Sequence, residues 1–309
     1  MATYDSYNAQ DIQLAEDVED TMWRDISPEE TPVMTLCQQQ SANQKLTEWL
    51  QISKRAPISN AQIEGADSPA ATGHTPDRLN NFTQIFEETA QTSDSIEASD
   101  EYGISSQMAE EIALKTTELK TDVEFAIVGA PGGTRQAGAA GATGVARELK
   151  CFQDQLDASV TIDALGVGTL TEDDVLACHQ AIRVKGGGKD LYMVHSIAAA
   201  LDVAKFVTSP TGEQAGRRRD LALQTQLVNA VETYQTPWGV LTAVQDDFID
   251  PRTCILLDPE YAAMKYLQPF QTKPLAEGGF YTKRGLLVEC TVAALNTGAS
   301  GFIDNIISV

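Results

Sequence analysis

The chain has 309 residues, of which 42% are hydrophobic and 21% charged, enough apolar material for one large globular unit or two domains. Its 44 acidic residues outnumber 22 basic ones, so the formal net charge is -22. A tight nucleic-acid clamp needs clustered Lys and Arg on its binding face, which this composition excludes. The acidic N-terminus lacks the features of a signal peptide, and no apolar run reaches the length of a membrane span. We therefore expect a cytosolic product.

Cysteine and histidine form no catalytic or metal-binding pattern. The five cysteines have no CxxC pair, which predicts reduced, buried thiols, and the three histidines are far apart in the sequence. Cys178 and His179 are adjacent on a predicted helix, so they point about 100 degrees apart and cannot act as nucleophile and base. We expect no catalytic residue, no metal site and no cofactor.

Two glycine-rich stretches leave one enzymatic alternative open. GGGKD at 186–190 lacks the Ser or Thr that follows a P-loop lysine, and Arg183 stands where the first glycine of that motif falls. The second stretch, 129–144, follows a predicted helix rather than a strand and is interpreted as a flexible loop. An α/β enzyme with a phosphate-binding glycine loop stays an alternative. The carboxylates in QDDFID (Asp246, Asp247 and Asp250) are interpreted as an exposed strand end.

The first third of the chain predicts an arm and a ribbon. Residues 1–45 are acidic and too poor in apolar residues for an independent core. Strand patterns at 46–55 and 80–89 flank a tip, 56–78, that is rich in Ala, Gly, Pro, Ser and Asn. An isolated two-stranded ribbon is marginal in water, so we expect it to rest on a neighbouring molecule.

The rest of the chain mixes helices and strands. Apolar residues recur at steps of four and seven from 104 to 128, which predicts a helix of about seven turns that ends at Gly129. Further patterns predict helices at 171–188 and 197–207, a short helix at 259–267, and strands at 191–196, 226–234, 238–249, 253–258 and 286–295.

Charge is distributed unevenly along the chain. The runs 1–30 and 86–102 are acid-rich, whereas Lys54 and Arg55 follow the first ribbon strand and Arg217–Arg219 lie in a polar loop. Such asymmetry can steer identical subunits together, and simple solubility is the alternative reading.

Several segments, in this order, resemble landmarks of the HK97-like major capsid proteins of tailed bacteriophages. They are ISPEETPVMTL, LTEWLQ, EGAD, RLNNFTQIF, ELKTDVEFAIV, ILLDPEYAAMKYLQPFQTKPLAEGG and LLVECTVAALN, and they extend from residue 26 to 296. The resemblance implies an α+β, HK97-like capsid fold with an N-terminal arm, an extended β-hairpin loop, a peripheral domain with a long spine helix and an α/β axial domain. The implied parts are the arm (1–45), extended loop (46–93), peripheral domain with spine helix (94–130), axial domain (131–265), return to the peripheral domain (266–299) and C-terminal strand (300–309).

The resemblance also implies a function. Such a subunit self-assembles into the hexamers and pentamers of an icosahedral shell that loosely encloses double-stranded DNA, inside a virion assembled in the host bacterial cytoplasm. The expected partners are other copies of the chain, a separate scaffolding protein and a portal, with no membrane; a decoration protein is a further candidate partner whose presence the sequence does not decide. An encapsulin-like bacterial nanocompartment is the alternative with the same fold. The candidate inter-subunit contacts are Trp49, Lys54, Arg55, Glu64, Asp67, Arg78, Arg217, Arg218 and Arg219.

Overall fold

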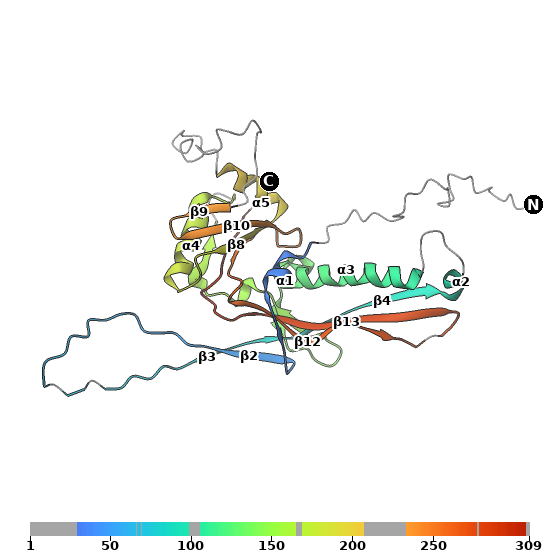
Figure 1. Cartoon of the computed structure of the whole chain (residues 1–309), viewed down its shortest axis with the longest axis horizontal. Helices are drawn as coiled ribbons and strands as arrows, with labels where there is room; N and C mark the ends of the chain where they lie inside the picture. Colours follow the sequence, from blue (N-terminus) through green and yellow to red (C-terminus); the bar gives the residue numbers. More distant parts are fainter. Residues whose placement is uncertain are drawn as a thin grey trace, which may run out of the picture.

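The computed structural model has the shape of a long, thin unit that carries a rounder unit at one end, with a thin loop projecting beyond it (Figure 1). The structure describes residues 30–65, 67–68, 70–98, 106–164, 169–206, 233–276 and 278–306. We call the thin unit the long-sheet unit and the rounder one the head unit. No described helix is both long and apolar enough to cross a membrane.

The long-sheet unit is built on a four-stranded sheet with the order β1-β12-β13-β4. Its strands are β1 (Gln38–Ser41), β4 (Gln84–Ser93), β12 (Ala262–Pro274) and β13 (Tyr281–Ala294), with α1 (Pro32–Leu36) before the first and α2 (Asp94–Glu97) after the second. The central pair is antiparallel, from Ala262 opposite Ala294 to Pro274 opposite Arg284. The last seven residues of β13 are all buried, so the core lies at the end nearest the head unit.

Helix α3 (Gln107–Val128) lies along this sheet (Figure 1). Ser106 caps its start, because the Ser106 hydroxyl accepts a hydrogen bond from the Ala109 N–H at 3.3 Å. The predicted apolar stripe is confirmed, although only its C-terminal part is fully buried, at Leu119, Val123 and Ile127. The helix ends at Gly129, where a Cβ would lie 2.7 Å from the Phe248 carbonyl oxygen, so only glycine allows this close approach.

The head unit is a six-stranded sheet with the order β7-β14-β11-β8-β10-β9 and two helices. Its strands are β7 (Thr161–Asp163), β8 (Leu191–His195), β9 (Thr233–Thr236), β10 (Gly239–Gln245), β11 (Cys254–Leu257) and β14 (Gly301–Asp304), and its helices are α4 (Glu172–Val184) and α5 (Ile197–Lys205). Strands β8 and β10 are parallel, as expected for strands joined by a crossover that contains a helix.

Alternate residues of the head sheet enter two different cores. In β11, Cys254 and Leu256 join the core beneath α4 and α5, whereas Ile255 and Leu257 join the core of the long-sheet unit. Successive side chains of a strand point to opposite faces, so one sheet closes both cores. The two units are therefore packed through a shared apolar interface that includes the C-terminal end of α3.

The ribbon consists of β2 (Leu46–Gln51) and β3 (Asp77–Phe82), paired from Leu46 opposite Phe82 to Gln51 opposite Asp77. It is shorter than the expected excursion of residues 46–93, because β4 leaves the ribbon at Thr83 and pairs with β13 instead. The turn-rich tip is confirmed: residues 52–76 form no strand in the described part and extend away from the body (Figure 1).

Three other predictions about local structure are wrong. Residues 259–267 were expected to form a short helix, but 262–267 belong to β12, because strands on both sides supply its backbone partners and override helix propensity. The glycine-rich stretch 129–144, expected to be a flexible loop, is partly a strand: it contains β5 (Ala137–Ala139), which pairs with β6 (Glu148–Lys150). Asp246 and Asp250, expected at an exposed strand end, are 1% and 2% exposed.

Candidate assembly surfaces

The base of the ribbon is held by the body of its own chain. The Trp49 indole N–H donates to the Ala294 carbonyl at 3.0 Å, and the Lys265 ammonium lies 5.0 Å from the centre of the indole ring. The Gln51 side-chain oxygen accepts hydrogen bonds from the backbone N–H and the hydroxyl of Thr297, both at 3.2 Å. These contacts define the direction in which the ribbon leaves the subunit.

A buried polar network lies where β3 passes into β4. The Thr83 hydroxyl donates to Glu289 at 2.7 Å, and the Arg147 guanidinium bonds both the Thr83 carbonyl and the Glu289 carboxylate. The Glu289 side chain is 4% exposed and that of Arg147 is 14% exposed, so this ion pair is largely removed from water. Charged groups in such a setting need each other, because either one left alone would be a buried, unpaired charge.

Asn81 adds a second tie between the ribbon and the body. Its side-chain amide donates to the Val292 carbonyl at 2.7 Å and to the Lys150 carbonyl at 3.0 Å, and its oxygen accepts from the Lys150 N–H at 2.7 Å. One buried side chain therefore joins β3, β6 and β13. Sequence reasoning missed this network, since its members are up to 211 positions apart.

The loop that continues the ribbon presents a long exposed surface. Every described residue from 52 to 76 is exposed, including three isoleucines, of which Ile63 is 83% exposed. Unstructured loops of this length are uncommon in compact domains and usually serve a function. Isolated apolar side chains this far from the body have no core of their own chain to enter, which fits contact with another molecule.

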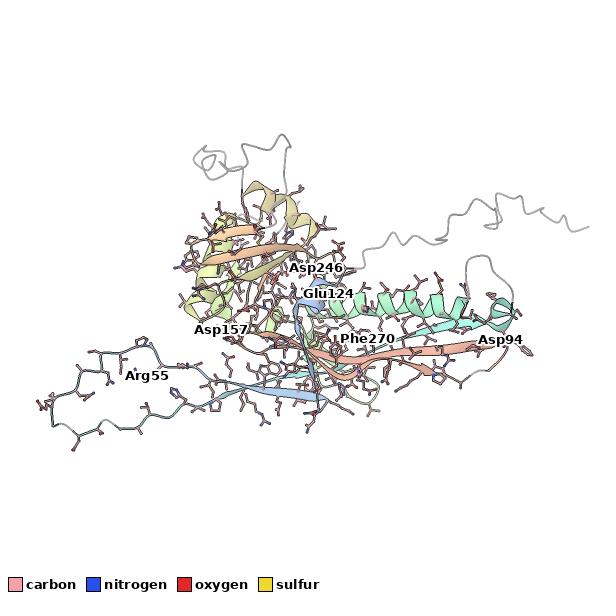
Figure 2. The ribbon with its side chains drawn as sticks, viewed as in Figure 1. Arg55, Asp94, Glu124, Asp157, Asp246 and Phe270 are labelled. Atoms are coloured by element: carbon pink, nitrogen blue, oxygen red, sulfur yellow. The ribbon has the colours of Figure 1, made fainter. Side chains whose placement is uncertain are left out.

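The candidate contact residues fall into four groups. Trp49 is half-buried and bonded within its own chain, as described above. Arg78 forms an ion pair with Glu48 across the ribbon, with the Arg78 side chain 68% exposed. Four others share the 52–76 loop and are exposed there, and no described contact joins them: Lys54, Arg55, Glu64 and Asp67 (Arg55 is labelled in Figure 2). Arg217, Arg218 and Arg219 lie outside the described residues.

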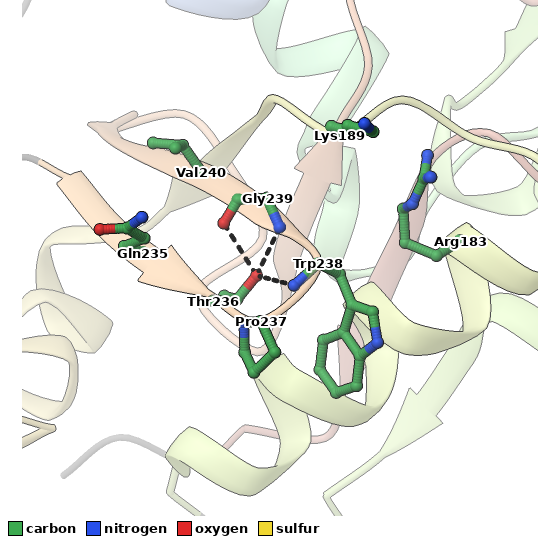
Figure 3. Close-up of a pocket in the computed structure, with 8 residues that line it drawn as sticks. All are labelled: Arg183, Lys189, Gln235, Thr236, Pro237, Trp238, Gly239 and Val240. Carbon is green, nitrogen blue, oxygen red and sulfur yellow. Dashed lines mark hydrogen bonds between the residues drawn. The ribbon is translucent and has the colours of Figure 1, made fainter.

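The head unit carries a cleft that the sequence analysis did not anticipate (Figure 3). It measures about 470 Å³ and lies between the C-terminal end of α4 and the turn from β9 to β10. Arg183, Lys189 and Trp238 line it, and no carboxylate is among the described lining residues. The Thr236 hydroxyl is used by its own turn, where it accepts from the Gly239 N–H at 3.2 Å. The cleft thus offers mainly hydrogen-bond donors and suits an acidic group.

The glycines at 186–188 have structural roles beside this cleft. Gly186 has φ of +90°, a left-handed conformation that ends α4. The Gly188 N–H donates to the Asp258 carboxylate at 2.9 Å, so this N–H is already paired and is not free to bind a phosphate. Burial raises the pKa of the Cys178 thiol and lowers that of His179, which keeps both groups neutral. The separate contacts of these two side chains, to the Val160 carbonyl and to Thr236, agree with the prediction that they do not act as a pair.

Solved structures resemble this chain over nearly its whole length. Mycobacterium phage Bobi matches with a TM-score of 0.64 and 11% identity, over 96% of this chain and 98% of that one. The holo-SrpI encapsulin complex of Synechococcus elongatus PCC 7942 matches with a TM-score of 0.59 and 12% identity, over 97% and 95%. A structure of phage G major capsid and decoration proteins matches with a TM-score of 0.56 and 11% identity, over 99% and 100%. The fold is thus the HK97-like fold of phage capsid subunits, which the encapsulin shares.

Comparison of the sequence with models of protein families identifies its family. The model of the SU10 major capsid protein family matches residues 2–306, and the chain belongs to this family. It is a major capsid protein of a tailed phage, a structural protein that assembles into the shell of the virion. No curated protein matches the sequence. The capsid prediction is confirmed, and the encapsulin alternative is reduced to a likeness of fold.

Proposed function

We propose that this capsid protein forms hexamers and pentamers that close an icosahedral shell around double-stranded DNA. The observation that carries the proposal is the ribbon with its 52–76 loop. The base of the ribbon is hydrogen-bonded to the body, whereas every described residue of the loop is exposed. Such a loop can stabilise the protein only when a neighbouring copy covers it. In a closed shell the same contact is repeated at every subunit.

The charge of the chain supports loose enclosure of DNA rather than specific binding. A formal net charge of -22 repels the DNA backbone, so packaged DNA could move without adhering to the wall. We further propose that the subunit has no catalytic role and that assembly occurs in the host bacterial cytoplasm. A separate scaffolding protein and a portal are the expected partners, and a decoration protein is a further candidate.

The nine candidate contact residues remain part of this proposal. Arg78 and the charged residues of the 52–76 loop are exposed and available to a neighbouring copy. The head cleft adds Arg183 and Lys189, two cations without a carboxylate partner among the described residues, in a chain with twice as many acidic as basic residues. An acidic surface of a second copy would complement them.

The test is to express the protein alone and together with its neighbouring genes, and to measure particle size by sedimentation and electron microscopy. Closed shells whose cargo is digested by DNase after opening would support the proposal. Closed shells that hold protein cargo and no DNA, when purified from infected cells, would contradict the packaging role while leaving assembly intact. A subunit that stays monomeric even with its neighbouring genes would contradict assembly itself.

A further inference from the structure

A single buried carboxylate holds the start of α1, the first described helix after the arm. Glu124 of α3 is fully buried, and its two oxygens accept hydrogen bonds from the Val33 N–H at 2.7 Å and the Met34 N–H at 2.9 Å. Pro32 has no N–H, so these are the first free amides of α1, and Thr31 in the N-cap position makes no capping bond with its side chain. A residue 91 positions away from Val33 therefore caps the helix.

This carboxylate lies beside a second one and has no cation as a partner among the described residues. Asp246, in the turn after β10, uses one oxygen to accept from the Phe248 N–H at 2.9 Å, while its other oxygen is buried without a partner. Figure 2 labels both residues where α3 meets the head unit. Burial and the charge of Asp246 raise the pKa of Glu124 to about 8, and burial raises that of Asp246 to about 6.

The other titratable groups around the pair do not neutralise it. The Cys37 thiol and the Tyr266 phenol face Glu124, and the pKa of each is raised to about 12, so both are uncharged near neutral pH. Asp247, next to Asp246, adds further negative charge. Within the described part of the chain, the charge of the pair can therefore fall only when the pair binds a proton.

We propose that Glu124 fixes the point at which the N-terminal arm leaves the subunit, and that Asp246 couples this anchor to the head unit through electrostatic repulsion. A change in the exit point alters which neighbouring copy the residues before Glu30 can reach. Glu124 is thus a positioning residue for assembly, beyond the general role of a shell subunit.

The sign of the pH effect follows from the binding of protons. With α1 docked, the Val33 and Met34 amides by themselves lower the pKa of Glu124, but burial outweighs them. Glu124 and Asp246 therefore hold their protons more tightly than they would when α1 is released and both carboxylates are hydrated. The docked state therefore binds more protons, and docking must weaken as pH rises through the range from about 4.5 to about 8. Above that range both carboxylates are ionised and the anchor is at its weakest.

Hydrogen exchange of the full-length, unassembled chain tests the proposal. The probe is the peptide that contains the Val33 and Met34 amides, and the internal reference is the Phe152 amide, which donates to the Ile127 carbonyl near the end of α3. After correction for the intrinsic pH dependence of exchange, we expect protection of the probe to fall about tenfold or more between pH 6 and 9 relative to the reference.

Two variants and a control make the result decisive. Glu124→Gln is a neutral mimic of the protonated carboxyl, so it should keep near wild-type protection at pH 6 and should lose the fall in protection between pH 6 and 9. Asp246→Asn should flatten the pH profile, and it keeps the oxygen that accepts from Phe248. Glu118→Gln, an exposed change on the same helix, should behave as wild type. A Glu124→Gln profile in which protection still falls between pH 6 and 9 as it does in the wild type would overturn the role of Glu124. Should that variant fail to fold, an Asp246→Asn profile identical to wild type would still overturn the coupling.

Discussion

The buried ion pair at the pivot of the ribbon makes a quantitative prediction. Replacing Arg147 by methionine keeps most of the side-chain volume but leaves the Glu289 carboxylate, 4% exposed, without its cation. Removing one partner of a buried pair costs about 3–5 kcal/mol. Since Arg147 is 14% exposed and water can reach its site, we expect the lower end, about 3 kcal/mol in the free energy of unfolding.

Urea unfolding of the unassembled subunit, followed by tryptophan fluorescence, measures this loss. Trp49 of the ribbon is bonded to Ala294 of the long-sheet unit, and Trp238 lies in the head unit, so the fluorescence reports on both units. A loss of this size lowers the melting temperature of a chain of this length by roughly 5–10 °C. Arg78→Met is the matched control: it removes an exposed pair with Glu48 and should cost less than about 1 kcal/mol.

The double variant Arg147→Met with Glu289→Gln separates charge from packing. The amide introduced by Glu289→Gln is neutral and can still accept a hydrogen bond from the Thr83 hydroxyl, so most of the lost stability should return. Two results would refute the importance of the buried charge: a cost for Arg147→Met no greater than that for Arg78→Met, or a double variant no more stable than the single one.

Three further predictions concern the loop, the cleft and the thiols. Replacing residues 56–74 by a short Gly-Ser linker should change the melting temperature of the subunit by no more than about 2 °C, because every described residue there is exposed. The same change should prevent regular shells in electron micrographs. Normal shells would exclude a role of the loop in assembly. Arg183→Glu combined with Lys189→Glu should reduce the yield of shells, most strongly at low ionic strength. Lys120→Glu, on the exposed side of α3, should leave the yield unchanged. Equal yields for the double variant and Lys120→Glu would exclude a role of the cleft in assembly. All five cysteines are free and buried, so a thiol reagent at pH 8 should label none of them before urea is added; rapid labelling of the folded subunit would contradict their burial.

Local pattern was sufficient for much of the fold. The four- and seven-residue steps of apolar residues predicted α3 to within a few residues, because a helix that lies on a sheet must bury one stripe. Thr171 and the three acidic residues after it marked the start of α4, where the Thr171 hydroxyl accepts from the Asp174 N–H at 3.2 Å. The excess of acid and the exposed ribbon already indicated a protein that assembles and does not grip DNA.

The contacts that organise the subunit could not be inferred in this way. The helix predicted at 259–267 is a strand because β1 and β13 flank it, and neither neighbour is visible in a local window. Arg147 and Glu289 are 142 positions apart, and Glu124 and Asp246 are 122 apart, so nothing in either neighbourhood marks them as partners. The sequence by itself determined which residues would be apolar stripes, caps, turns and charged surface, since those depend on neighbours along the chain. Only the tertiary structure decided which charges are buried and paired, because burial depends on segments that the fold brings together from distant parts of the chain.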